Sequence, residues 1–78
     1  MPAHRYFFHT GFSGNVQEDH EGVALESPEA AWEQATKACG EFILEVDGNM
    51  KVGSSWQMTV TDDTGPLFEI SLSSRRLR

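Results

Sequence analysis

Hydrophobic and polar positions alternate along two stretches late in the chain, and this period of two predicts strands. The stretch WQMTVT (56–61) points every second, apolar side chain to one face, and LFEISLS (67–73) does the same from its second residue. Between them, DDTGP (62–66) carries the Asp, Gly and Pro that favour tight turns. The two strands are therefore predicted to form an antiparallel hairpin. Its polar face holds Gln57, Thr59, Thr61, Glu69 and Ser71.

A run of three aromatic residues predicts a first strand over residues 4–10, in the stretch HRYFFHT. Because successive side chains of a strand point to opposite faces, Tyr6 and Phe8 share one face. The other face holds Arg5, Phe7 and His9. The strand therefore presents an aromatic ring to both sides of the sheet.

The segment between this strand and the helix is predicted to be less regular. Gly11 and Gly14 indicate a turn. The stretch VQEDHEG is interpreted as a polar, acidic loop or a weak strand. The stretch GVALE follows as a short extended piece, which supplies a second strand ahead of the helix.

One helix is predicted over residues 27–48, SPEAAWEQATKACGEFILEVDG. Ser27 can cap the free amides, Pro28 suits the first helical position, and Gly48 is a typical residue at which a helix ends. An apolar stripe recurs at helical spacing and would face the sheet. Its members are Ala31, Ala35, Ala38, Cys39, Phe42 and Val46, widened by Trp32 and Ile43.

The order strand, short strand, helix, strand, strand predicts an α+β fold, a small antiparallel sheet with one amphipathic helix on one face. The 78 residues suit a single domain, 1–78. A single helix shields only one side of the sheet, so the other side must meet water or a companion molecule. We expect that side to form an interaction surface, with Arg5, Phe7, His9, Gln57, Thr59 and Glu69.

Several of these stretches together resemble the DUF6894 family, small bacterial domains of unknown function. The opening RYFFH, the segment DHEGVALESPEAAWEQA and the closing WQMTVTDDTGPLFEISL carry the resemblance. Gln34 and His20 depart from the family pattern, which has acidic residues there. The resemblance implies a compact α+β fold and carries over no catalytic or ligand residue. The matching positions are Arg5, Tyr6, Phe7, Phe8, Asp19, Glu21, Gly22, Ala30, Ala31 and Ala35.

The net charge of the chain limits the kinds of molecule that it is expected to bind. Twelve acidic residues against six basic ones give a formal net charge of −6. This field repels phosphates and anionic lipids, so neither nucleic acid nor a membrane is expected as a partner. Half of the basic residues lie in the last four positions, as a solvated tail or a small basic contact patch: Arg75, Arg76 and Arg78.

The single cysteine, Cys39, cannot form an intramolecular disulfide, and its place on the helical stripe predicts a buried, unreactive thiol. We expect no signal peptide and no membrane span, and therefore a cytoplasmic protein.

Candidate chemistry is sparse. His9, Asp19 and His20 could form a metal site, although a solvated acidic loop with surface histidines accounts for the same residues. Asp62 and Asp63 are interpreted as turn residues. Arg5 could stack on an aromatic ring or pair with a carboxylate such as that of Glu69. The aromatic left over, Phe7, either lies under a neighbouring loop or forms the centre of a contact surface.

Two functions remain in view. The first is a non-catalytic protein-interaction module, with an unidentified protein partner, that self-associates as a homodimer. The alternative is a small-ligand or metal-binding domain that uses His9, His20 and the acidic loop. No plausible set of acid, base and nucleophile stands out, so we expect neither an enzyme nor a bound cofactor.

Overall fold

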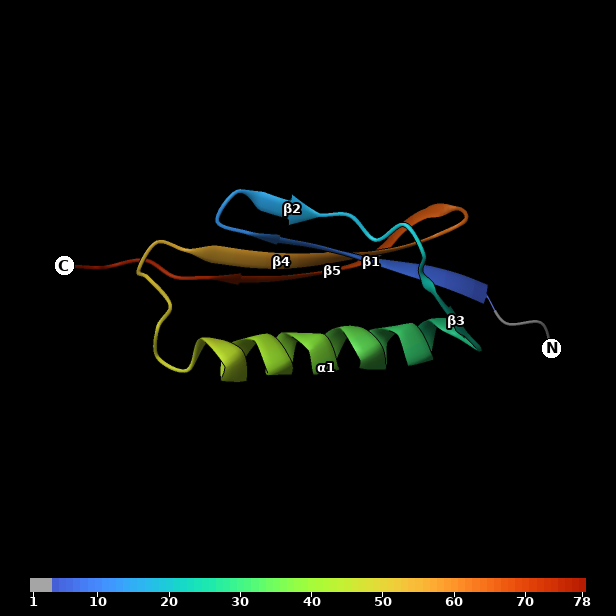
Figure 1. The fold of residues 1–78 in the computed structure, drawn as a ribbon, viewed down its shortest axis with the longest axis horizontal. Helices are drawn as coiled ribbons and strands as arrows, with labels where there is room; N and C mark the ends of the chain where they lie inside the picture. Colours follow the sequence, from blue (N-terminus) through green and yellow to red (C-terminus); the bar gives the residue numbers. More distant parts are fainter. Residues whose placement is uncertain (1–3) are drawn as a thin grey trace.

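Five strands form one antiparallel sheet, and one helix lies along one of its faces (Figure 1). The computed structural model describes residues 4–78. The α+β class and the expected chain order are confirmed, with one three-residue strand more than predicted. The elements are β1 (His4–Phe12), β2 (Asn15–Gln17), β3 (Val23–Leu25), α1 (Pro28–Val46), β4 (Ser55–Asp62) and β5 (Gly65–Ser73).

Strand β1 lies inside the sheet and is paired along both edges. On one edge it pairs with β4, which pairs in turn with β5. On the other edge, β2 pairs with the end of β1 and β3 pairs with its beginning. The predicted hairpin of β4 and β5 is present, with a register shift between Val60 and Thr61. Among residues 4–78, no strand pairs with the outer edge of β5.

Helix α1 begins where the sequence predicts. The Ser27 hydroxyl accepts a hydrogen bond from the Ala30 amide at 3.2 Å, and Pro28 is the first helical residue. The helix ends at Asp47, which adopts a left-handed conformation (φ 41°) and donates its amide to the Ile43 carbonyl. Gly48 follows with φ 82°, so the turn away from the helix starts one residue earlier than the glycine alone predicts.

The core lies between α1 and the sheet. Ala31 and Ala35 are completely buried, and their small side chains let the helix approach the strands closely. Toward its end the helix contributes Phe42, which stacks on Trp56 and meets Phe12 edge to face, both with ring centroids 5.1 Å apart. The sheet supplies the other buried side chains, Tyr6, Trp56, Met58 and Val60. The alternation in the sequence therefore assigned Trp56, Met58 and Val60 to the correct face.

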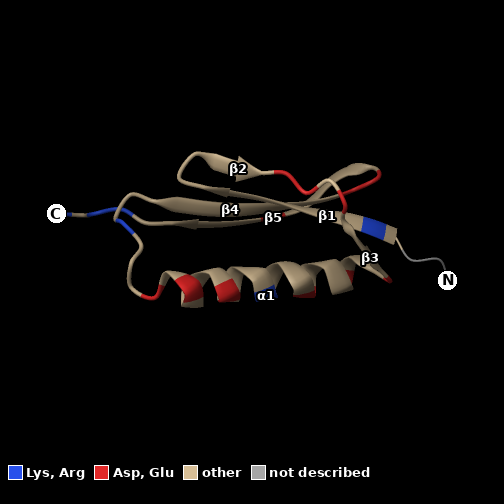
Figure 2. Cartoon of the chain, in the orientation of Figure 1, with Lys and Arg blue, Asp and Glu red and all other residues tan. Residues whose placement is uncertain are grey.

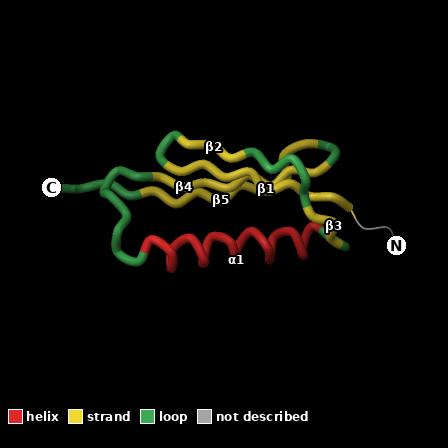
Figure 3. The backbone as a smooth tube through the Cα atoms, viewed as in Figure 1, coloured by secondary structure: helices red, strands yellow, loops and turns green. Residues whose placement is uncertain are grey.

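Two local predictions are wrong, namely that the first strand ends at residue 10 and that Gly11 lies in a turn. The first strand continues beyond residue 10 because β4 pairs with it as far as Phe12, so Gly11 lies inside the strand. The other predicted turn residue, Gly14, does lie in the turn, together with Ser13, and both have positive φ angles (87° and 49°). Chain direction reverses there, and the expected acidic loop begins only after the short strand β2 (Figure 3).

The apolar stripe of the helix is narrower than predicted. Trp32 is 43% exposed and Ile43 is 49% exposed, although the Trp32 ring also packs against Phe68 of β5, with ring centroids 5.2 Å apart. Cys39 is half-buried against the core. Helix α1, the one helix of residues 4–78, does not have the apolar length that crossing a membrane requires.

Candidate functional site

The sheet face that points away from α1 is called here the open face. Strand register brings His9, Thr59 and Glu69 into one row across β1, β4 and β5. The neighbouring row consists of Gly11, Gln57 and Ser71. Residues directly opposite each other in a sheet project to the same face. The expected interaction surface is therefore assembled on one face from three strands: Phe7, His9, Gln57, Thr59 and Glu69.

A shallow hollow of about 230 Å³ lies on the open face. Gly11 supplies no side chain at a position flanked by Gln57 and Val16, so the sheet surface is lower there. The hairpin of β1 and β2 rises beside it, on the side of the sheet opposite α1 (Figure 1). His9 and Thr59 line the hollow as well, so its walls combine polar side chains with the apolar side chain of Val16.

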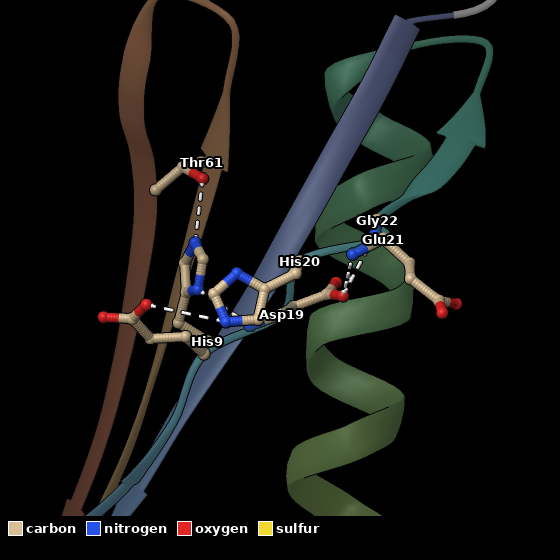
Figure 4. A network of polar contacts seen from close by, with 7 residues as sticks. His9, Asp19, His20, Glu21, Gly22 and Thr61 are labelled. Atoms are coloured by element: carbon tan, nitrogen blue, oxygen red, sulfur yellow. Dashed lines mark hydrogen bonds and ion pairs between the residues drawn. The ribbon is translucent and has the colours of Figure 1, made fainter.

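His9 is held at both ring nitrogens (Figure 4). Its Nδ1 accepts the amide of Asp19 at 3.1 Å, and its Nε2 lies 3.1 Å from the hydroxyl of Thr61. An amide can only donate, so Nδ1 must be unprotonated and the neutral ring carries its proton on Nε2. The imidazole therefore joins the loop after β2 to the end of β4, and it has no free nitrogen for a ligand.

The Asp19 carboxylate is the second centre of this network. It accepts amide hydrogen bonds from Phe8 at 3.1 Å, from Glu21 at 3.1 Å and from Gly22 at 3.0 Å. These bonds, with that from Gly22 the largest contribution, hold the pKa of Asp19 below its usual value. The carboxylate thus binds a loop to β1 where neither β2 nor β3 pairs with the strand.

Phe7 lies beside the same loop. A Cβ atom at Gly22 would come within 2.9 Å of the Phe7 ring and 2.8 Å of the Tyr6 carbonyl oxygen. Gly22 has φ 70°, so the loop passes over this edge of the ring in a conformation suited to glycine. Phe7 is half-buried as a result, and the loop interpretation accounts for part of its surface. The rest faces solvent on the open face.

Arg5 does not form the ion pair considered from the sequence. Its guanidinium donates to the backbone carbonyl of Glu21, in the loop, rather than to the carboxylate of Glu69. Glu69 lies two strands away, opposite Thr59, and its carboxylate contacts the Ser71 hydroxyl at 3.5 Å. Arg5 therefore borders the open face as part of the loop attachment.

The residues of the alternative metal site converge only in part. His9 and Asp19 are in contact, but through the Asp19 amide rather than its carboxylate. The His20 side chain is 81% exposed, and its Nε2 lies 3.8 Å from Glu18. Within residues 4–78, no group of three His, Cys, Asp or Glu side chains is arranged to hold a metal ion.

The remaining candidates have structural roles or lie on the surface. The Asp62 carboxylate accepts the amide of Thr64 at 2.9 Å and its hydroxyl at 2.7 Å, as expected of a turn. The Thr64 hydroxyl, followed by the Thr64 amide, keeps the pKa of Asp62 below its usual value. The three arginines of the C-terminal segment are exposed: Arg75, Arg76 and Arg78.

Sequence reasoning missed Thr61 as a partner of His9 and Gly11 as the base of the hollow. Thr61 stands 52 positions away from His9, and only the pairing of β1 with β4 brings them together. The signal for Asp19 was present, because an Asp that precedes a glycine by three residues commonly caps a turn through its carboxylate.

The fold and this face define a small α+β domain. A family model described as "Domain of unknown function (DUF6894)" matches residues 5–73. The chain therefore belongs to the DUF6894 family, as its sequence resemblance predicted. No curated protein and no solved structure gives a significant match to the chain.

Proposed function

We propose that this protein is a non-catalytic protein-interaction domain, and that its open face binds a second protein that carries basic side chains. The observation that carries the proposal is the hollow over Gly11, which lies on the sheet face that α1 leaves uncovered. A volume of about 230 Å³ is enough to accept one or two side chains of a partner. Val16, which is 70% exposed, offers an apolar contact at its rim.

Charge supports a basic partner. Acidic residues border the open face at one end, in the loop after β2 and in the turn between β4 and β5 (Figure 2). Glu69 adds an exposed carboxylate within the face. Arg5, at the border of this face, already donates a hydrogen bond to a backbone carbonyl of the loop. With a net charge of −6, the domain would attract a basic surface and orient it during encounter.

The alternative function, binding of a small ligand in the hollow, has weaker support. A ligand site normally offers convergent polar groups with free hydrogen-bonding capacity. In this hollow both nitrogens of His9 are occupied by Asp19 and Thr61. The polar side chains of the lining that remain for a ligand include those of Gln57, Thr59, Ser13 and Ser55.

Site-specific photo-crosslinking tests the proposal. A photoreactive residue replaces Gln57 in the hollow or, as a matched control, the exposed Gln34 on the helix. We expect one discrete protein adduct from position 57 in the native host, weakened by high salt, and none from position 34. Equal adducts at both positions would contradict the proposal.

A second pair of variants shows whether the hollow itself is used. Gly11→Leu fills it, whereas Gly11→Ala leaves most of it open, and a Cβ there meets its neighbours only at 3.8 Å or more. The adduct should disappear in the first variant and persist in the second, with both folded by circular dichroism. An adduct that survives Gly11→Leu would contradict binding in the hollow.

A further inference from the structure

The outer edge of β5 carries unpaired backbone groups. Two hydrogen bonds establish which residues face it: Ser13 donates to the Ser55 carbonyl, and Ser74 donates to the Ser54 carbonyl. Amides alternate in direction along an antiparallel ladder, so after the register shift, from Phe68 onward, even-numbered residues of β5 face β4 and odd-numbered ones face outward. Within residues 4–78, no strand meets this row of donors and acceptors, at Glu69, Ser71 and Ser73.

The chain stays extended beyond the end of β5. The bond from Ser74 to Ser54 continues the ladder by one residue, and the C-terminal segment 74–78 then leaves the sheet at the end farthest from β3 (Figure 1). This segment carries Arg75, Arg76 and Arg78, half of the basic residues of an acidic chain. Figure 2 shows this basic segment extending away from the sheet and the helix.

We propose that two copies of this chain pair antiparallel along their β5 edges, with the C-terminal segment of each copy lying against the first half of β5 of the other. A twofold axis beside Leu72 places Ser71 opposite Ser73 of the second copy. Both residues direct their backbone groups outward, so this register forms regular ladder bonds. The two sheets would become one continuous sheet, with both helices on the same face.

Charge complementarity selects this register. It places Arg75 of the second copy opposite Glu69, and both side chains project to the open face. A shift by two residues would instead set Glu69 against Ser73 and leave Arg75 beside Leu67. The favoured register also brings Leu77 of the second copy, 82% exposed, toward Leu67, 38% exposed.

The helix side of the edge offers a second complementary pair. A groove of about 330 Å³ is lined by Pro28, Glu29, Trp32 and Phe68, and it lies beside the first half of β5. In the same register, Arg76 of the second copy stands opposite Phe68 on this face. Its guanidinium can stack on the exposed ring of Trp32 and pair with the carboxylate of Glu29. The chain cannot make these contacts with its own C-terminal segment. Strand β5 carries that segment to the end of the sheet opposite the start of α1 (Figure 1).

This inference concerns the strand edge and does not depend on binding at the open face. Light scattering coupled to size exclusion, over concentrations up to the millimolar range, measures the oligomeric state. We expect a concentration-dependent dimer for the natural sequence. A monomer throughout that range would overturn the proposal.

Charge exchange identifies the contact. Glu69→Arg or Arg75→Glu alone should weaken dimerisation by at least about tenfold, because each places like charges opposite each other. The double variant restores opposite charges and should recover the dimer. Glu33→Arg and Lys37→Glu, on the exposed side of α1, make the same charge changes and should have no effect. This register would be refuted if Glu69→Arg left dimerisation unchanged. It would also be refuted if the double variant dimerised no more strongly than the single variants.

Removal of residues 75–78 provides a test that changes no residue of the sheet. The truncated chain keeps the bond between Ser74 and Ser54 and should fold, as monitored by circular dichroism. We expect it to be monomeric and to exchange the amides of Glu69 and Ser71 rapidly, whereas the dimer protects them. A truncated chain that dimerises as the natural one does would exclude the C-terminal segment from the interface.

Discussion

The carboxylate of Asp19 accepts the backbone hydrogen bond from Phe8 that a neighbouring strand would otherwise accept. It accepts the Phe8 amide at 3.1 Å, at the point of β1 that lies between the pairing regions of β2 and β3. A backbone donor left without a partner inside a sheet is costly. One residue of the loop therefore completes the edge of β1 with its carboxylate and positions His9 with its backbone amide.

Substitution of Asp19 tests this role. Asp19→Asn removes the charge and turns one of the two accepting oxygens into a donor, which faces an amide of the loop or of β1. We expect the free energy of unfolding to fall by about 1–3 kcal/mol, measured by urea denaturation. Asp63→Asn is the matched control in an exposed turn position and should change stability by less than about 0.5 kcal/mol. Equal effects of the two substitutions would contradict the role given to Asp19.

Acid should weaken the fold through the same carboxylates. The pKa of Asp19 and that of Asp62 lie below the value of 3.8 that each has when unfolded, so the folded state binds fewer protons. Their stabilisation is complete above that value and is lost as the pH falls through it and on through the lower folded pKa. Denaturation at a series of pH values should show this loss, reduced in Asp19→Asn. An identical acid dependence in the variant would exclude Asp19 as a source.

Two glycines should respond in opposite directions to alanine. Gly22→Ala forces a Cβ to within 2.8 Å of the Tyr6 carbonyl at φ 70°, so it should destabilise the fold by about 1–3 kcal/mol or more. Gly40 lies exposed within α1 with nothing within 4 Å, so Gly40→Ala should stabilise by about 1 kcal/mol. Thermal unfolding of both variants measures whether each substitution raises or lowers the stability. Stabilisation by Gly22→Ala would mean that the loop does not pass so close to β1.

The arrangement around His9 predicts a particular tautomer. In the neutral form of the ring, nitrogen NMR should find the proton on Nε2, because Nδ1 accepts the Asp19 amide. Thr61→Val removes the hydroxyl beside Nε2 but leaves the Asp19 contact, so the tautomer should persist while the Nε2 resonance moves. A ring protonated on Nδ1 would show that the Asp19 contact is absent in solution.

The sequence was informative wherever structure depends on neighbours along the chain. Alternation assigned Trp56, Met58 and Val60 to the helix face, and Ser27 with Pro28 located the start of α1. Such patterns involve only a few neighbouring residues, so they can be recognised without knowledge of the fold. The end of the helix was predicted to within two residues for the same reason.

Features that depend on strand register could not be read from the sequence. The hollow over Gly11 requires β1 to continue past residue 10, which pairing with β4 decides, and local turn signals suggested the opposite. The partners of His9 come from the loop after β2 and from β4, at separations of 10 and 52 residues. The uncovered sheet face itself was nevertheless foreseen in outline, because a single helix can cover only one face of a sheet.

Accessibility of the open face, with and without a partner, tests the central claim most directly. A soluble gadolinium complex broadens NMR signals of exposed methyl groups. We predict strong broadening of Val16 and Thr59 in the free protein, relief of it when the cross-linked partner is added, and no broadening of Val60 in either sample. Methyl groups of the open face that remain equally broadened with the partner bound would contradict the account.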